Sequence, residues 1–465
     1  MSVALLSAVE QLDLLRKKKI SPLELIDEHI ARIERLNPVL HAFADFDAER
    51  ARQQARFAGH GPLTGLPLTI KSSISTRGYK CEIGSLLHRG DVPQQDAEAV
   101  ARLRRAGAVI LGTTNCPEFL MAYESDNLLH GRTNNPWDTE RTAGGSSGGE
   151  AAAIAAGLSA GGLGSDSGGS VREPAHFSGI CALKPTAGRV PAAGHLPPCV
   201  GPFSFLGSIG PMARTIADVE LLFSTVSGRE ISDPSSTPVP ARTIPLAEAK
   251  RARIGWFEDD GLVPVTPETR EAVRSAAAAL ERQGFQVTPY RPASLEAVRK
   301  LWHIFFVQCG AMFYAPMIAG REEQLSPVFR GFLDIAAAEP PLTAASLLHA
   351  WAESDAVRRE LLREMQEFPL LLLPVCSTPA FRHNERSWTI EGSEVQYLDA
   401  MRYTQWFNLL ASPAAVVPVG CSADGLPIGV QIAGRPYEDE LVLTVAAAIE
   451  SEFGYKPPPL SSVNV

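Results

Sequence analysis

Apolar positions along the chain follow two spacings, one typical of helices and one typical of buried strands. Residues 21–24 read Ser-Pro-Leu-Glu, a capping box with proline in the first turn. Apolar residues then recur at helical spacing as far as Asn37-Pro38, so we predict a helix that begins at residue 22 and ends there. By contrast, LPLTI at 66–70 is one continuous apolar run, which predicts a short buried strand with Lys71 at its carboxyl end.

Strand and helix signals then alternate. Asp96 is expected to cap a helix over 97–107, and the strand-like segment AVILG at 108–112 follows at once. A strand, a helix and a strand in this order predict parallel strands joined by a crossover helix. The same alternation predicts further strands at 252–257, 370–373, 414–419 and 428–434, and further helices from Thr215 to Gly228, from Thr266 to Gly284 and over 439–450.

One stretch looks like a linker, residues 231–243 (ISDPSSTPVPART). It is compatible with a loop that joins two halves of one sheet and also with a domain boundary. A chain of 465 residues has room for about three average domains, although single α/β domains also run long. No internal repeat is visible.

Composition narrows the class of protein. Hydrophobic residues make up 45% and charged residues 20% of the chain, as in ordinary globular proteins. The net charge of −9 argues against a nucleic-acid binder, which would carry a basic face. The N-terminal positive cluster follows the apolar residues, so it does not look like a secretory signal. The longest run of small apolar residues, 151–164, is too short to span a bilayer.

Cysteine and histidine usage indicates the compartment and the cofactors. Seven cysteines form no CxxC pair, and an odd number suits a reducing compartment, so we expect a soluble cytoplasmic protein. The thiols are most simply buried small hydrophobes. No cluster of histidine, aspartate and cysteine has metal-ligand spacing, so neither a metal nor an organic cofactor is expected.

Two segments rich in glycine and serine carry the candidate chemistry. The first, GSDSGGSVR at 164–172, has side chains that look too small for a core segment. A backbone with such small side chains can approach a ligand closely and direct its N–H groups at one point. Ser170 is a candidate nucleophile in it. The nearest histidine, His176, has no obvious partner, and so no base for Ser170 is evident from its neighbours.

The second segment, TAGGSSGGEAAAIAAG at 142–157, has several interpretations. One interpretation is a flexible linker. The other is a tight loop at the N-terminus of an alanine-rich helix, where free N–H groups favour developing negative charge. Residues 144–148 also match the G-x-S-x-G nucleophile elbow, but the elbow needs a preceding strand and NPWDTERTA is polar. The first segment does not match a nucleotide-binding loop, because the G-x-G-x-x-G pattern is broken at Ser167.

Three motifs at fixed spacing resemble one family. GLPLTIKSSIS with Lys71, GGSSGGE with Ser146 and GSDSGGSVREPAHFSGICALKPT with Ser170 are similar to the amidase signature family, and the spacings of 75 and 24 residues agree with it. The resemblance runs from about residue 10 to about 452. It implies a single α/β domain over 1–465, with a central, mixed, largely parallel twisted sheet and helices on both faces. The signature core would cover about 60–230, and residues 245–465 would complete the sheet and the pocket.

The resemblance also implies a mechanism. Ser170 would be the nucleophile, Ser146, preceded by a cis peptide bond, would relay its proton, and Lys71 would be the base. A lysine base must be held neutral, by burial or by nearby positive dipoles. The implied oxyanion hole consists of the backbone N–H groups of Ser167, Gly168, Gly169 and Ser170.

Other residues are expected to support the site or to depart from the family pattern. Asp166 and Arg172 are more simply scaffold than reactants, and the aromatic stretch at 301–314 is more often core than pocket. Ser72-Ser73 replaces a frequent Asp-Asn, and Glu173 stands where relatives often have an apolar or amide residue. Several segments look most like the branch of fatty acid amide hydrolases, without the membrane-spanning N-terminus of some of these.

We therefore predict a serine amidohydrolase that cleaves a carboxylic acid amide through an acyl-enzyme on Ser170. The expected partner is a small-molecule amide substrate. Neither binding to nucleic acid nor a membrane span is expected, and the sequence is compatible with a homodimer. The alternative is the glutaminase (A) subunit of a tRNA-dependent amidotransferase, although SFLGSIGP at 204–211 lacks the Asp-Gln frequent in such subunits. An esterase of the elbow type would instead carry its acyl group on Ser146.

Overall fold

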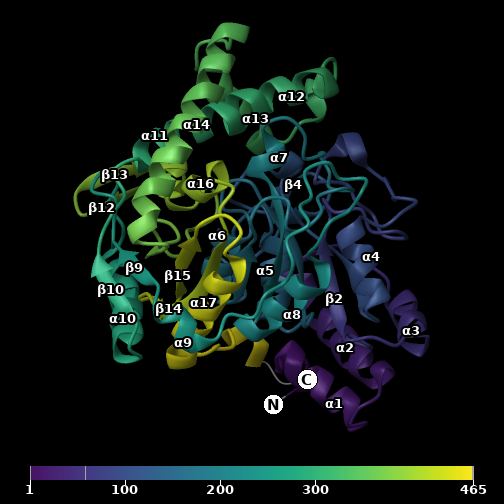
Figure 1. The fold of residues 1–465 in the computed structure, drawn as a ribbon. Helices are drawn as coiled ribbons and strands as arrows, with labels where there is room; N and C mark the ends of the chain where they lie inside the picture. Colours follow the sequence, from purple (N-terminus) through teal and green to yellow (C-terminus); the bar gives the residue numbers. More distant parts are fainter. Residues whose placement is uncertain (1, 58, 463–465) are drawn as a thin grey trace.

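The computed structural model describes residues 2–57 and 59–462, and its centre is a large sheet (Figure 1). Among the described residues eleven strands form it, in the order β1 (Phe43–Phe46), β3 (Val109–Thr114), β2 (Pro67–Lys71), β6 (Gly161–Asp166), β8 (Ser208–Ala213), β7 (Cys181–Lys184), β14 (Ala414–Cys421), β15 (Pro427–Gly434), β11 (Leu370–Pro374), β9 (Arg253–Trp256) and β10 (Gln286–Pro289). Two small hairpins lie outside it, β4 (Asp126–Asn127) with β5 (Gly131–Arg132), and β12 (Ser387–Ile390) with β13 (Ser393–Gln396).

Helices surround this sheet. In the described part of the chain they are α1 (Ala8–Arg16), α2 (Pro22–Leu40), α3 (Ala48–Arg56), α4 (Glu98–Arg105), α5 (Gly148–Ala155), α6 (Arg172–Ser178), α7 (Phe203–Leu206), α8 (Ile216–Val226), α9 (Leu246–Ala249), α10 (Pro267–Arg282), α11 (Leu295–His303), α12 (Cys309–Ile318), α13 (Pro327–Ala337), α14 (Ala344–Glu367), α15 (Tyr397–Ala400), α16 (Arg402–Leu409) and α17 (Asp439–Phe453). Short 3-10 or π turns lie at Val3–Leu5, Leu86–His88, Glu118–Leu120, Ile304–Gln308, Glu322–Gln324 and Pro459–Ser462.

The predicted α/β class, with a mixed sheet and helices on both faces, is confirmed. Strands β3, β2 and β6 are parallel neighbours, as are β11, β9 and β10. Antiparallel pairs through β8, β7, β14 and β15 join these two groups, so parallel pairing dominates only within each group. The first group comes from the N-terminal half and the second from the C-terminal half, and both halves therefore share one sheet.

Two apolar layers hold the helices to the sheet. On one face, α4, α8, α10 and α17 pack on side chains of β2, β6, β8, β14 and β15 in the largest core cluster. On the opposite face, α5 and α6 pack on β7, β8 and β14 (Figure 1). Helices α2 and α3 cover α5 and β3 from outside. The helix α5, which follows the Ser146 loop, is thus buried on both sides.

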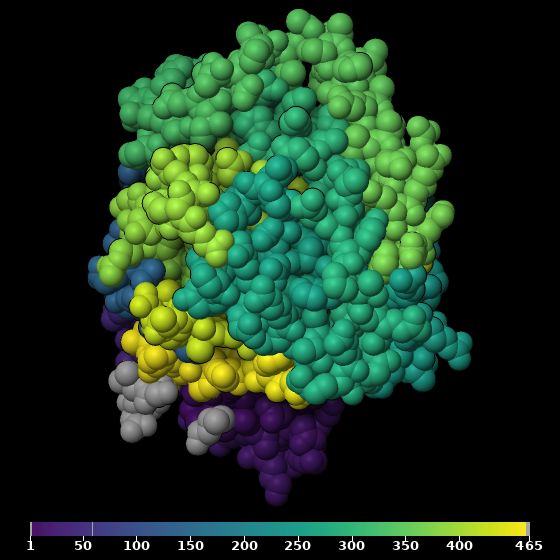
Figure 2. Space-filling model, turned by 90° about the vertical axis from the view of Figure 1, so that its left-hand side faces the viewer, coloured from purple at the N-terminus to yellow at the C-terminus, as the bar shows by residue number. Residues whose placement is uncertain are grey.

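A helical cap stands at the end of the molecule where α11, α12, α13 and α14 gather (Figure 1, top). In Figure 2 the same green helices cover the upper part of the surface. The expectation of a core segment at 301–314 is confirmed for Trp302, Phe305 and Tyr314, which are buried in an aromatic cluster with Phe329. The neighbouring side chains of Phe306 and Val307 instead line a cavity.

By length and composition alone, the continuous helical stretch from Leu295 to Ile318 is apolar enough to cross a membrane, with a mean hydropathy of 1.4. Core helices of soluble proteins meet the same criterion, and 44% of the apolar window is buried inside the protein. The absence of a membrane span therefore stays a prediction.

Two helix boundaries differ from their predictions. Helix α2 continues past Asn37-Pro38 to Leu40, because Leu36 and Leu40 extend its buried apolar face and the proline falls in the last turn, where few backbone bonds remain to be lost. Asp96 does not cap α4: its carboxylate accepts the N–H of Arg77 instead.

The cysteines differ in exposure. Cys421 is exposed and Cys199 partly exposed, so the expectation of buried thiols holds for the other five cysteines.

Residues 164–166 of the glycine- and serine-rich segment, which looked unsuited to a core, end a buried central strand, and the rest of the segment forms a loop and the first residue of α6. Gly161–Asp166 forms β6, whose residues are all buried between β2 and β8. Its glycines make room for close neighbours, since a Cβ on Gly162 would overlap Glu150 and the Thr69 backbone, and one on Gly164 would press on Ser147 and Val171. Small side chains here therefore indicate close packing of α5 and α6 rather than exposure.

We expect Gly162→Ala to destabilise the protein. The new methyl group would overlap the carbonyl oxygen of Thr69 on the adjacent strand, and that backbone atom cannot move aside. Overpacking of this kind costs about 1–3 kcal/mol. Urea unfolding followed by circular dichroism measures the change in the free energy of unfolding.

The matched control is Gly331→Ala in α13, where a Cβ would meet nothing within 4 Å. Alanine is the better helix former, so this variant should be neutral or more stable by up to about 1 kcal/mol. A Gly162→Ala protein as stable as the wild type would contradict the packing described for β6.

Candidate active site

Lys71 ends β2 and is fully buried. Its Nζ lies 2.6 Å from Ser146 Oγ, 3.1 Å from Ser165 Oγ and 3.3 Å from the Ser165 carbonyl oxygen. The parallel pairing of β2 with β6 brings Ser165 to this position. The amine therefore has three oxygen partners inside the protein, one of them the predicted relay serine.

Ser146 lies in the loop that leads into α5. The Gly145-Ser146 peptide bond is cis. The N–H of Gly145 donates to Glu173 Oε2 at 2.9 Å, and the N–H of Ser147 donates to the Ser170 carbonyl oxygen at 3.2 Å. These bonds tie the Ser146 loop to the Ser170 loop. The linker interpretation is wrong, because the segment is buried. No strand among the described residues leads directly into Ser146, as a nucleophile elbow would need.

Ser170 lies in the loop between β6 and α6, and it is 9% exposed. Side chains from distant segments hold the loop before it by its carbonyl groups. Trp302 Nε1 donates to the Ser167 oxygen at 2.8 Å, and Tyr123 and Thr404 each donate a hydroxyl to the Gly168 oxygen at 2.8 Å. The sequence alone identifies none of these three partners, since each is far from the loop along the chain.

The backbone N–H groups of this loop differ in their availability. Among the described residues, those of Ser167, Gly168 and Ser170 have no protein acceptor. The N–H of Gly169 donates to Asp166 Oδ1 at 2.7 Å. This engagement departs from the expectation that all four N–H groups point at one oxyanion. Gly169 also has a φ of 120°, a conformation that favours glycine.

The structure thus brings Lys71, Ser146 and Ser170 to one place. Ser146 and Ser170 line the same small cavity, although no hydrogen bond joins their hydroxyl groups in the described structure. His176 takes no part, because its ring accepts the N–H of Gly429 and its Nε2 lies 3.0 Å from the Thr378 carbonyl oxygen.

The electrostatics favour a neutral lysine. Burial lowers the pKa of the Lys71 ammonium to about 8, against smaller opposing effects from Cys116, Asp166 and Glu150. Glu150, on α5, is also fully buried, and burial raises the pKa of its carboxyl group to about 8. Thr69 and Thr114 donate hydroxyl groups to it at 2.5 and 2.7 Å. Its place in the GGSSGGE motif is visible in the sequence, but its burial beneath β2 and β3 is not.

A buried ion pair fixes the turn between β6 and α6. Asp166 and Arg172 are both fully buried, and two bonds of 3.0 Å join them. Asn408 bonds to both partners, and Asp166 also accepts the N–H groups of Gly169 and Val171. Although burial raises the pKa of Asp166, the guanidinium of Arg172 holds it well below its usual range. The expected scaffold role matches these contacts.

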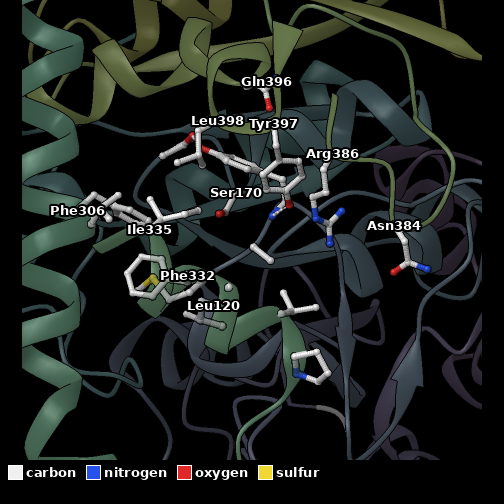
Figure 3. A pocket seen from close by; sticks show the side chains of 18 residues that line it. Leu120, Ser170, Phe306, Phe332, Ile335, Asn384, Arg386, Gln396, Tyr397 and Leu398 are labelled. Carbon is white, nitrogen blue, oxygen red and sulfur yellow. Dashed lines mark hydrogen bonds between the residues drawn. The ribbon is translucent and has the colours of Figure 1, made fainter. Parts of the chain in front are cut away.

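Two cavities meet at Ser170. The larger, of about 540 Å³, is lined mainly by apolar residues of the helical cap and of the segments around 120 and 398. Figure 3 shows Ser170 at its centre, with Phe306, Phe332 and Ile335 on one side and Arg386 and Tyr397 on the other. The smaller, of about 30 Å³, is lined by Ser146, Ser165 and Ser167 and by aromatic side chains and prolines. Among the described residues, no group of three or more His, Cys, Asp or Glu side chains is placed to hold a metal ion.

The α/β sheet thus carries a buried lysine next to two serines and a glycine loop. A model of the amidase family matches residues 24–443, and the chain belongs to the amidase signature family. It is an amide-cleaving hydrolase, as its relatives and structural neighbours are.

Individual relatives differ in what they act on. The chain is 34% identical to the (A) subunit of a glutamyl-tRNA(Gln) amidotransferase of Roseiflexus castenholzii, over 96% of this chain and 95% of the relative. It is 33% identical to an indoleacetamide hydrolase of Bradyrhizobium diazoefficiens, over 96% of this chain and 86% of the relative. A solved structure of 6-aminohexanoate cyclic dimer hydrolase complexed with substrate has a TM-score of 0.87 and 28% identity, and covers 99% of this chain and 100% of that chain. Placement near the fatty acid amide hydrolases stays a prediction.

We expect Arg172→Met to destabilise the protein strongly. The substitution leaves the Asp166 carboxylate buried without its cation, and breaking a buried pair in this way costs about 3–5 kcal/mol. The loss should be largest near neutral pH and smaller in acid, where Asp166 in the variant can become protonated. Chemical denaturation at pH 7 and pH 4 measures both.

A surface pair provides the control. Arg274 bonds to Glu258 with about half of its side chain exposed, at 52%. Arg274→Met should therefore cost less than about 1 kcal/mol. Equal losses for the two variants would contradict a special contribution from the buried pair.

Proposed function

We propose that the protein hydrolyses carboxylic acid amides through an acyl-enzyme on Ser170, with Ser146 as proton relay and Lys71 as general base. The observation that carries the proposal is the 2.6 Å contact between Lys71 Nζ and Ser146 Oγ, next to the cavity that Ser170 lines. A buried lysine with a lowered pKa can accept the serine proton, and the serine can then accept the proton of Ser170.

In the first half of the reaction, Ser170 Oγ attacks the amide carbon. Its proton moves to Ser146 Oγ, and the proton of Ser146 moves to Lys71 Nζ. The free N–H groups of Ser167, Gly168 and Ser170 are the available donors for the oxyanion, and preorganised donors of this kind commonly supply several kcal/mol. The proton then returns through Ser146 to the leaving nitrogen, and the C–N bond breaks. Water attacks the ester by the reverse route and releases the carboxylic acid.

The second candidate is the glutaminase subunit of a tRNA-dependent amidotransferase, favoured by the identity with the Roseiflexus castenholzii protein. Glutamine carries two charged groups beside its α-carbon, and each needs a partner when it is desolvated. The one charged residue that lines the larger cavity in the described structure, Arg386, is already paired with Glu124 at 2.6 Å. This pairing supports an amidase that acts alone. Hydrolysis of simple amides by the isolated chain, compared with glutamine, separates the two candidates.

A serine-directed fluorophosphonate should attach to Ser170, because this hydroxyl faces the cavity and has the relay next to it. Ser170→Ala should abolish both labelling and amide hydrolysis, whereas Ser146→Ala should keep slow labelling while kcat falls by a factor on the order of 10² or more. Peptide mapping by mass spectrometry locates the adduct. An adduct on Ser146 or Ser147 would show that the assignment is wrong.

Lys71 should set the pH dependence. The base works only when it is deprotonated, so kcat/KM should rise with pH through an apparent pKa near 8 and then level off. Lys71→Arg keeps the charge but cannot lose it in a protein, and its activity should be nearly as low as that of Lys71→Ala. Initial rates between pH 6 and 10 measure both effects. Lys71→Arg with more than about a tenth of the wild-type kcat/KM, a loss below about 1.4 kcal/mol, would contradict a neutral-lysine base.

A further inference from the structure

The two cavities at Ser170 are unequal in size and in polarity. Four residues line both of them, namely Leu120, Met121, Ser170 and Phe306. Phe306 is held in place by stacking on Trp302, with ring centroids 4.6 Å apart, and Trp302 is itself bonded to the Ser167 carbonyl group. A carbonyl carbon bound at Ser170 therefore has one substituent directed into each cavity.

The position of the relay decides which substituent enters which cavity. The leaving nitrogen needs a proton before the C–N bond breaks, and in the proposed mechanism Ser146 delivers it. Ser146 lines the smaller cavity and is absent from the lining of the larger one. The nitrogen must therefore lie on the side of the smaller cavity, and the acyl group on the side of the larger.

The smaller cavity has room for little more than an amino group. Its volume of about 30 Å³ is small beside the 540 Å³ of the larger cavity. Its walls include Phe203, Phe313 and Tyr314, which pack against one another or on Phe306. A substituent on the nitrogen would have to displace these rings.

The larger cavity suits a bulky, uncharged acyl group. Its volume of about 540 Å³ is in the range of ordinary ligand pockets, and Met121, Val307, Phe332, Ile335 and Leu398 contribute apolar walls. Arg386 does not offer a free charge, since it is paired with Glu124 and lies over the ring of Tyr397 at 4.8 Å. An acyl group with its own carboxylate would find no unpaired cation among the described lining residues.

We propose that the substrates are primary amides of carboxylic acids with a large, apolar, uncharged acyl group, and that the leaving group is ammonia. This proposal rests on the proposed function. The C–N bond breaks as the nitrogen takes the proton of Ser146, and Ser146 regains a proton from Lys71. The acyl group stays on Ser170 until water releases the acid, so that one amide and one water give one acid and one ammonia.

The test compares three amides with wild-type protein and with Ser170→Ala. Phenylacetamide has a large acyl group and a free amino group, N-butylphenylacetamide adds bulk on the nitrogen, and acetanilide reverses the arrangement. We expect kcat/KM for phenylacetamide to exceed that for each of the other two by 100-fold or more. Equal Ser170-dependent rates, or a preference for acetanilide, would overturn the proposal and leave the proposed function intact. Hydrolysis that persists in Ser170→Ala would overturn the proposed function itself.

Matched variants assign the selectivity to the cavities. Phe203 lines the smaller cavity and Ile335 the larger one. Phe203→Ala should lower the preference for phenylacetamide over N-methylphenylacetamide at least tenfold, whereas Ile335→Ala should leave this ratio within twofold and shift the preference among acyl chain lengths. Phe313→Ala opens the same small cavity from α12 and replaces Phe203→Ala if that variant does not fold. An unchanged ratio in a folded variant of the small cavity would overturn the assignment.

Discussion

The burial of the Lys71 amine is the constraint on which the site depends. An ammonium group loses most of its hydration at the end of β2, and Ser146 and Ser165 offer oxygen atoms without a full opposite charge at bonding distance. The neutral form therefore becomes accessible near neutral pH, and only that form can accept a proton. Glu150 lies deeper under the same strands with a raised pKa, so it does not supply a firmly ionised carboxylate that would keep the lysine charged.

That burial requires the helix and loops to approach the sheet closely, and glycine makes this approach feasible. A Cβ on Gly149 would overlap the Asn115 backbone, and one on Gly145 the Glu124 backbone. The Asp166–Arg172 pair holds the other side of the site, because Asp166 binds two N–H groups of the turn that presents Ser170. Two loops that differ in sequence position are thus fixed against one another before any substrate binds.

Local signals in the sequence are enough to predict β2 with Lys71 at its end and the loop of Ser146 before a helix. They are not enough for Tyr123 and Thr404, which hold the Ser170 loop from 45 and 236 residues away. The sequence of β6 is misleading, because its small residues suggest an exposed loop. They are small because Glu150, Ser147 and Val171 pack against the strand, and these contacts cannot be read from the sequence. The cis bond at Ser146 and the triad come from the family resemblance and not from periodicity, which carries no information about contacts between distant loops.

The motifs and the cavity walls carry different kinds of information. Lys71, Ser146 and Ser170 lie in the three motifs, at the end of β2 and in the loops before α5 and α6. Apart from Gly168 and Ser170, the walls of the larger cavity come from the helical cap, from residues 120–123 and from the segments near β12 and β13, all outside these motifs. Relatives of similar identity can therefore share the same reacting groups and still act on different amides, as the contrast between an indoleacetamide hydrolase and a component of an amidotransferase illustrates. The motifs therefore identify this protein as an amide-cleaving hydrolase, whereas most walls of the larger cavity come from residues outside the motifs.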